Sequence, residues 1–307
     1  MDLREELERL YQDGRFMDLL VKSEECFFKT NALECLYYLL LALVYYGDIK
    51  MAYVRLKQFL KRGGNLNNEN IANISANVCT LSLDVNMLKG LEPYMDDATK
   101  MNVILQVWGD VHKVKKMLES SQIGEFERDY ITVKISRISA QPINLDIGYF
   151  RKKFSGKLSR VEILTGEFEI FMYKIFSGEI DVIKDINPFI KELGEHRLIK
   201  IASLLQLYIS LLKQDYPYIC LMEQAFENMG DNYAWFIARI FRSFLEGRDL
   251  LGDTSIPEEY KILKTNYLLM RKYLYNEDFR SPELKGFKHF WWLVNKAVKN
   301  DLWVNFS

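Results

Sequence analysis

The chain has 307 residues, of which 49% are hydrophobic and 27% charged, and its formal net charge is −1. This length and apolar content allow a large core, and the balanced charge excludes a strong overall field toward nucleic acid or an anionic membrane. With only 6 Pro and 16 Gly, the composition favours long helices joined by short loops. The 4 cysteines lack CxxC spacing, so we expect neither a metal site nor a disulfide framework, and each cysteine should fill core as a small apolar side chain.

The first 31 residues predict two helices joined by a turn at Gly14-Arg15. Leu3, Leu7 and Leu10 form an apolar stripe on the first helix, and charged residues cover its other faces. This pattern suits the solvent-facing end of a repeat array. The charged start of the chain is unlike a signal peptide, so the simplest expected location is the cytoplasm.

Residues 36–60 predict the clearest helical hairpin. The apolar run 35–46 is too long for a typical strand and well short of the roughly 20 residues that a membrane-spanning helix needs. Gly47 can adopt the positive φ that ends a helix, and Asp48 is a good N-cap for the next one. The second arm is amphipathic, with one apolar face made by Ala52, Leu56, Phe59 and Leu60.

The rest of the chain repeats this pattern less regularly. A polar loop at 63–70 is followed by further helical segments, and Pro93 and Pro142 interrupt two of them. The last residues, 302–307 (LWVNFS), are largely apolar, and we expect them to dock on the body of the protein. The predicted helices after the loop cover residues 71–83, 87–94, 98–108, 111–118, 123–139, 160–177, 180–192, 198–213, 216–229, 233–245, 258–275 and 282–300.

The predicted turns recur at a nearly constant interval. Gly14 and Gly47 are 33 residues apart, Gly178 and Gln214 are 36 apart, and Gln214 and Gly247 are 33 apart. A hairpin with this period resembles the tetratricopeptide repeat (TPR), a helix–turn–helix unit of about 34 residues. Aligning Gly47 with the turn glycine of the repeat assigns Leu36, Leu39 and Leu43 to its first helix and Ala52, Leu56 and Phe59 to its second, whereas Leu40 and Gly64 depart from the pattern.

The resemblance implies an all-α fold: an α-solenoid of antiparallel helix hairpins that forms a TPR-like right-handed superhelix. We expect an N-terminal TPR-like array in residues 1–140 and an irregular basic connector in residues 141–160. A C-terminal TPR-like array with capping helices is expected in residues 161–307.

In TPR proteins the first helix of each hairpin lines an inner groove, and an aromatic groove suits a peptide or a partner helix. The alternative, at helical spacing, is that these side chains pack as core between repeats. Carrying the groove positions over gives Glu34, Tyr37, Leu41, Val44, Tyr45, Phe168, Met172, Phe176, Leu204, Tyr208 and Leu212.

Residues 146–160 are basic, with no acidic residue between Asp146 and Glu162. Aromatic residues interleave, which is typical of a contact to phosphate, nucleic acid or an acidic peptide. The alternative is a solvated helix face whose aromatic side chains point to the core. The basic residues are Arg151, Lys152, Lys153, Lys157 and Arg160.

Sequence motifs of known chemistry are absent. The histidines His112, His196 and His289 lack the HExxH spacing of a zinc protease, and the chain has no GxGxxG, Walker or GxSxG motif. We therefore expect no catalytic residue, no cofactor and no metal ion. A site assembled from residues distant in sequence stays open, because spatial neighbours cannot be read from the sequence.

The expected function is that of a non-enzymatic cytoplasmic scaffold or adaptor that binds a peptide or protein partner on its inner surface. This step is an analogy of fold. Two alternatives stay open: a nucleic-acid-associated or regulatory protein that uses residues 151–160, and an all-α enzyme with an unrecognised site. Trp292 lies in the middle of a lysine-rich helix face, so it is a candidate for tail docking or for an interface with a partner or a second copy.

Overall fold

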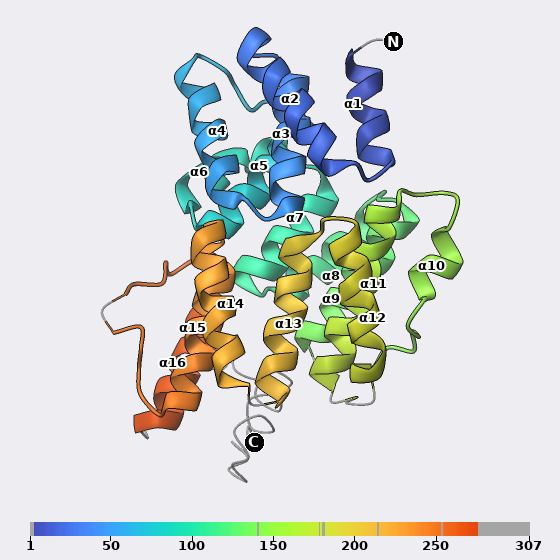
Figure 1. The fold of residues 1–307 in the computed structure, drawn as a ribbon. Helices are drawn as coiled ribbons and strands as arrows, with labels where there is room; N and C mark the ends of the chain where they lie inside the picture. Colours follow the sequence, from blue (N-terminus) through green and yellow to red (C-terminus); the bar gives the residue numbers. More distant parts are fainter. Residues whose placement is uncertain are drawn as a thin grey trace.

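The computed structural model describes residues 3–275 except residues 140, 178, 180, 181, 214 and 253, and of residues 183, 212 and 273 only the backbone. All regular elements in this part of the chain are helical (Figure 1), which confirms the all-α class. The helices are α1 (Leu3–Gln12), α2 (Phe16–Thr30), α3 (Leu33–Tyr46), α4 (Ile49–Lys61), α5 (Glu69–Ser82), α6 (Val85–Leu91), α7 (Asp97–Val103), α8 (Val111–Ser120), α9 (Glu125–Ser139), α10 (Tyr149–Phe154), α11 (Arg160–Ser177), α12 (Ile183–Glu195), α13 (Ile199–Lys213), α14 (Tyr216–Met229), α15 (Asn232–Glu246) and α16 (Lys261–Tyr275).

Two short elements complete the described fold: η1 (Glu92–Tyr94), a 3₁₀ turn, and η2 (Ile104–Trp108), a π-helical turn. The single helix predicted for residues 98–108 is therefore α7 followed directly by η2. Among the described residues, none of the helices combines the length and apolar content needed to span a membrane.

The hairpin turns have the local chemistry expected from the sequence. Gly47 has a φ of 98° and its N–H donates to Leu43, and the Asp48 side chain accepts a hydrogen bond of 2.9 Å from the N–H of Met51. Positive φ favours glycine, and a short polar side chain satisfies an open N–H of the first helical turn. The same type of aspartate N-cap recurs at Asp84, Asp96, Asp110, Asp215 and Asp231.

The cysteine prediction is wrong for two residues. Cys26 on α2 and Cys35 on α3 are joined by a disulfide, with their Cα atoms 5.7 Å apart. The antiparallel packing of consecutive helices brings them together, and a search for CxxC spacing does not detect such pairs. Both remain buried in the core, as expected, and Cys79 and Cys220 are free thiols.

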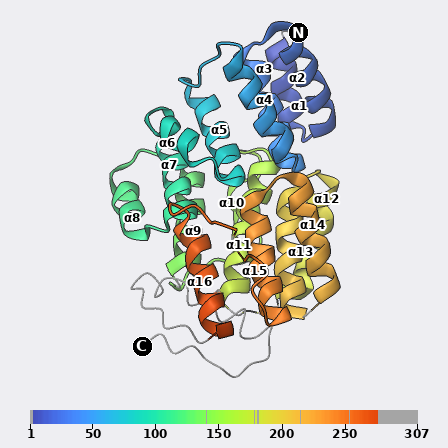
Figure 2. The same cartoon turned by 90° about the vertical axis from the view of Figure 1, so that its left-hand side faces the viewer.

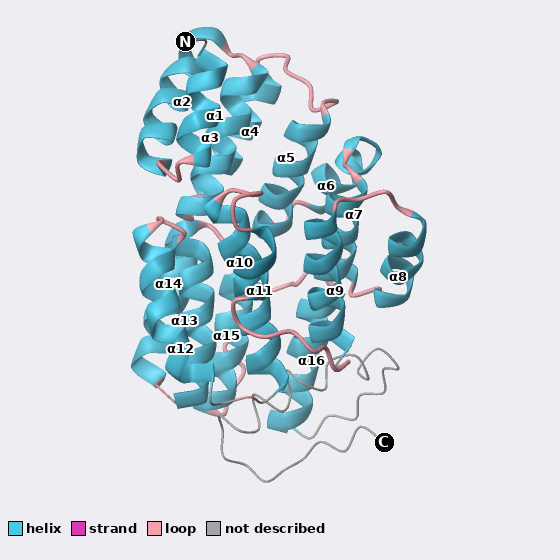
Figure 3. Cartoon of the chain, turned by 90° about the vertical axis from the view of Figure 1, so that its right-hand side faces the viewer, coloured by secondary structure: helices cyan, strands magenta, loops and turns pink. Residues whose placement is uncertain are grey.

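The helices at the two ends of the described chain pack against each other. α13, α14, α15 and α16 contact α3, α4, α5 and η2, respectively. Figures 1, 2 and 3 place α1–α4 at one end of the molecule and α11–α16 with α9 at the other, with α5 and α7 between them. In an extended solenoid each repeat contacts only its neighbours. Here α13, α14 and α15 also contact helices of the N-terminal part of the chain.

Several specific contacts hold this closure. The hydroxyl of Tyr260 donates to the carbonyl oxygens of Cys79 (3.3 Å) and Thr80 (3.0 Å) at the end of α5. The turn between α14 and α15 lies so close to α4 that a Cβ on Gly230, whose φ is +71°, would be 2.9 Å from the backbone nitrogen of Lys50. A glycine is therefore required there for both space and conformation.

Candidate functional site

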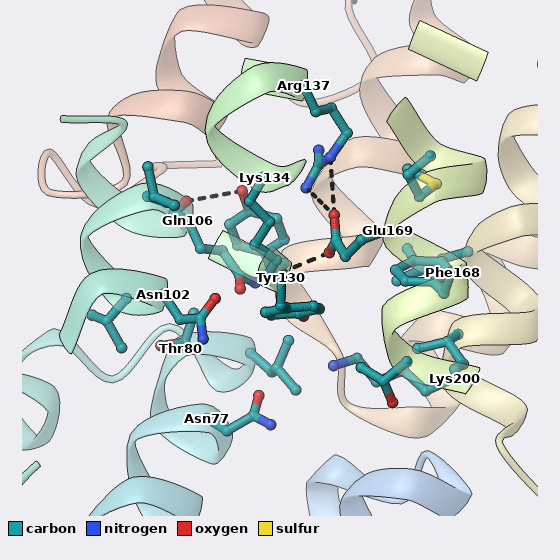
Figure 4. Close-up of a pocket in the computed structure, with 18 of the residues that line it drawn as sticks. Asn77, Thr80, Asn102, Gln106, Tyr130, Lys134, Arg137, Phe168, Glu169 and Lys200 are labelled. Atoms are coloured by element: carbon teal, nitrogen blue, oxygen red, sulfur yellow. Dashed lines mark hydrogen bonds and ion pairs between the residues drawn. The ribbon is translucent and has the colours of Figure 1, made fainter. Parts of the chain in front are cut away.

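A cavity of about 510 Å³ lies at the centre of the fold. Its wall is formed by side chains from α3, α5, α7, η2, α9, α11, α13, α15 and α16, so both halves of the chain contribute to it (Figure 4). Ligand pockets in proteins typically have volumes of about 300–1,000 Å³. The cavity thus has the size of a small-molecule site.

One side of the cavity is lined by uncharged polar side chains. In Figure 4, Asn77 and Thr80 from α5 lie beside Asn102 from α7 and Gln106 from η2. The π-helical turn η2 places Gln106 in this wall. The backbone carbonyl oxygen of Gln106 accepts a hydrogen bond of 3.0 Å from the hydroxyl of Tyr233. Such turns are frequent at functional sites.

The opposite side contains a buried charge cluster. Glu169 of α11, only 2% exposed, lies 3.5 Å from the ammonium of Lys134 and 3.2 Å from the guanidinium of Arg137, both on α9. Burial lowers the pKa of Lys134, and the carboxylate of Glu169 opposes that shift. Because two cations share one carboxylate, the cluster carries one excess positive charge when all three groups are ionised.

Lys200, in the first turn of α13, is a separate cation in the wall. Its side chain extends into the cavity toward Tyr130 (Figure 4). Burial lowers the pKa of Lys200, while Asp231 raises it and Lys134 lowers it further. Asp231 is completely buried and caps α15 through Ala234, and burial raises its pKa.

Aromatic rings form much of the remaining wall. Tyr208 and Phe176 pack edge to face with ring centres 5.2 Å apart, and Lys134 lies over the ring of Tyr130 at 4.7 Å. Burial raises the pKa of Tyr208 to about 12, so its hydroxyl stays neutral at physiological pH. The wall therefore offers aromatic surface together with hydroxyl and amide groups.

Three buried polar residues of the wall have an atom without a hydrogen-bond partner: Thr80 Oγ1, Asp231 Oδ2 and Asn266 Oδ1. Their side chains are at most 4% exposed. An unpaired buried polar group costs about 1–3 kcal/mol, so such groups in a native protein point to a role other than stability.

The structure brings most of the predicted groove residues together in this cavity. Glu34 is instead exposed, Leu41 is buried outside the cavity wall, and Tyr37 is half-buried outside it. The side chain of Leu212 and all of Trp292 lie outside the described residues. The groove residues that line the cavity are Val44, Tyr45, Phe168, Met172, Phe176, Leu204 and Tyr208.

Sequence reasoning missed the charged residues of the cavity. Glu169 lies among apolar residues in the second half of α11, but Glu167 and Lys174 of the same helix are charged too, so its pattern did not single it out. Lys134 and Lys200 lie on helices with ordinary mixed patterns, so their burial could not be read from the sequence.

The basic segment is largely neutralised by acids from other helices. Arg151 lies 2.6 Å from Glu192 of α12, Arg160 pairs with the same carboxylate, and Lys153 lies 2.7 Å from Asp129 of α9. Burial alone would raise the pKa of Glu192, but hydrogen bonds and charge from Arg151 and Arg160 outweigh it and hold that pKa below its ordinary value. This segment is therefore tied to the body of the protein.

The rest of the basic segment has the character of a solvated helix face. Phe150 and Phe154 are buried in a local apolar cluster, as the alternative interpretation expected. Lys152 and Lys157 are exposed and have no ion-pair partner among the described residues. Two unpaired lysines should bind a polyanion much more weakly than the five basic residues counted in the sequence would.

The remaining sequence candidates do not meet at a chemical site. His112 is exposed and His196 is half-buried, neither lines the cavity, and His289 lies outside the described residues. Within the described ranges, histidine, cysteine, aspartate and glutamate side chains form no cluster suited to a metal ion. Comparison of the chain with protein-family models, curated proteins and solved structures gives no match.

Proposed function

We propose that this protein is a non-enzymatic binding protein that holds a small polar molecule in the central cavity. The observation that carries the proposal is the convergence of charged, amide and aromatic side chains from nine helical elements on one space of about 510 Å³. A concave site of this size with a few convergent polar groups is the typical setting for a small ligand.

The proposal retains the expected binding site, the inner surface of a TPR-like array, but replaces the protein partner with a small molecule. In this interpretation α13–α16 close over the inner surface, so that the groove positions face a cavity instead of an open channel. A folded protein is too large for 510 Å³. The second candidate is the end of a peptide, which is supported by the groove residues Tyr45, Phe168 and Leu204 in the cavity wall.

Binding is favoured over catalysis because the one buried carboxylate of the charge cluster is already engaged. Glu169 accepts contacts from Lys134 and Arg137 at 3.5 and 3.2 Å. Each oxygen of this carboxylate therefore already has a cationic partner in the wall. The cluster is better suited to fixing the shape and charge of the cavity than to proton transfer.

The test uses phenylnaphthylamine, a neutral aromatic probe whose fluorescence rises in apolar surroundings. We expect saturable one-to-one binding to the wild-type chain, which should be lost in Asn77→Trp, because Asn77 faces the cavity and a larger ring there fills it. Asn67→Trp, in an exposed loop, is the matched control and should bind like wild type. An absence of probe binding, or equal binding by both variants, would refute a cavity site.

A further inference from the structure

Lys200 differs from the other cations of the cavity because its charge has no direct partner. Lys134 and Arg137 both contact Glu169, whereas no carboxylate of the described residues lies within ion-pair distance of Lys200. Asp231 acts on Lys200 only at longer range. Lys200 is half-buried, and a partly desolvated charge without a direct partner costs stability that a ligand of opposite charge would recover.

The acids elsewhere in the wall do not neutralise Lys200. Asp96 accepts hydrogen bonds from Asn73 (2.7 Å) and from the first turn of α7, and Glu162 accepts from Ser159 at the start of α11. Glu127, in the first turn of α9, also lines the cavity, but the charged groups that shift the pKa of Lys200 are Asp231 and Lys134 alone. Lys200 therefore presents a local positive charge in a wall that also contains acids.

The surface next to Lys200 is apolar. Leu204 and Tyr208 follow it at intervals of four residues on α13, and all three line the cavity. Residues four apart lie on the same face of a helix. Met172 and Phe176 of α11 line the same cavity, and the ring of Phe176 contacts that of Tyr208. One face of α13 thus combines a cationic end with an apolar body.

We propose that the ligand of this cavity is an organic anion, with its carboxylate, phosphate or sulfonate group bound by Lys200 and its apolar body lying along Leu204 and Tyr208. The ligand would supply the direct ionic contact to Lys200 that Asp231 provides only at longer range. This inference rests on the proposed small-molecule function and adds the charge and shape of the ligand.

The experiment compares two fluorescent probes with the same ring system. Anilinonaphthalene sulfonate carries an anionic sulfonate group, and phenylnaphthylamine lacks this group and is neutral. We expect the full chain to bind the anionic probe about tenfold more tightly than the neutral one, the ratio expected for one charge-assisted hydrogen bond. Lys200→Met should abolish this preference, and Lys200→Arg should retain it. Lys157→Met, at an exposed lysine, is the control and should leave both affinities unchanged.

The outcomes separate this inference from the proposed function. If both probes bind equally and Lys200→Met changes neither affinity, the cavity is a ligand site but the anion assignment is wrong. If neither probe binds, both proposals fail. The probe ratio of the wild-type chain is decisive even without the variants, because it requires no change to the fold.

Discussion

The contact between Tyr260 and α5 offers the sharpest test of the closed arrangement. Tyr260 is completely buried, although 180 residues separate it from its acceptor Thr80. Its hydroxyl donates at 3.0 Å to the carbonyl oxygen of Thr80 and at 3.3 Å to that of Cys79. Tyr260→Phe removes only this hydroxyl, so its effect isolates the hydrogen bonds from the burial of the ring.

The expected magnitude follows from which acceptors lose a partner. The Cys79 carbonyl keeps its bonds from the N–H groups of Leu83 and Asp84, whereas the Thr80 carbonyl loses the Tyr260 hydroxyl. Tyr260→Phe should therefore lower the free energy of unfolding by about 1–2 kcal/mol. For a chain of this size, that corresponds to a fall of about 2–3 °C in the unfolding midpoint. Tyr260→Ala also removes the buried ring and should cost about 3–5 kcal/mol.

Urea unfolding followed by circular dichroism measures these differences. Tyr46→Phe is the matched control, because Tyr46 is 39% exposed and the same hydroxyl is removed without burial. If Tyr260→Phe is as stable as Tyr46→Phe, the hydroxyl contact to α5 does not exist. If Tyr260→Ala also has little effect, residue 260 does not pack on the N-terminal half and the closed arrangement is wrong.

Three further predictions test the core, the charge cluster and the connector. Ala52→Leu should lower the free energy of unfolding by about 1–3 kcal/mol, because Ala52 is fully buried and the larger side chain overpacks the core. Val54→Leu is the control, because Val54 is 40% exposed, and an equal loss of stability in this variant would contradict the explanation. Glu169→Gln should cost about 3–5 kcal/mol in urea unfolding, since it leaves two buried cations without a counter-charge, and a neutral result would mean that the cluster is solvated. Glu192→Gln should destabilise the protein at neutral pH. The pKa of Glu192 is lower in the folded protein than in the unfolded chain, where it is about 4.3. The carboxylate therefore stabilises the fold above that pH, and this stabilisation is lost as the pH falls through the lower folded pKa. Unfolding measured across this range should show the stabilities of the wild-type protein and the variant converging in acid.

The helices and their turns could be predicted because their causes are local. The run of apolar residues that forms α3, the positive φ of Gly47 and the N-cap of Asp48 depend on neighbours within a few positions. The same reasoning left residues 230–232 between two predicted helices but did not identify Gly230 and the N-cap Asp231 as the turn. Its glycine is needed partly for a contact with Lys50, which no local pattern reveals.

The cavity could be predicted only in part. The resemblance to TPR hairpins selected apolar and aromatic residues on the inner faces of the helices, and seven of them share the cavity wall. The charges in that wall depend on contacts between α9, α11 and α13, helices that are distant in sequence. In the sequence, Lys134 and Lys200 resemble ordinary surface lysines; the fold buries Lys134 and leaves Lys200 half-buried in the cavity wall.

The basic segment shows what a local count of charges leaves out. Residues 147–160 contain five cations and no acid, which left both a polyanion-binding surface and a solvated helix face open. The neutralising carboxylates Asp129 and Glu192 belong to α9 and α12, so the net charge of this region is a property of the fold. Local charge runs predict surface potential only when the surrounding helices contribute no opposite charges.

The closure of the chain determines what the inner surface can bind. In an open helical array, the first helix of each hairpin faces a groove that accepts an extended peptide. Here α13 contacts α3, and α15 contacts α5, so the same faces meet across a cavity of about 510 Å³. Lys200 of α13 faces this space together with residues of α3 and α5, so a ligand there would contact both halves of the chain. The closed arrangement therefore fits the small organic anion proposed above better than an extended peptide.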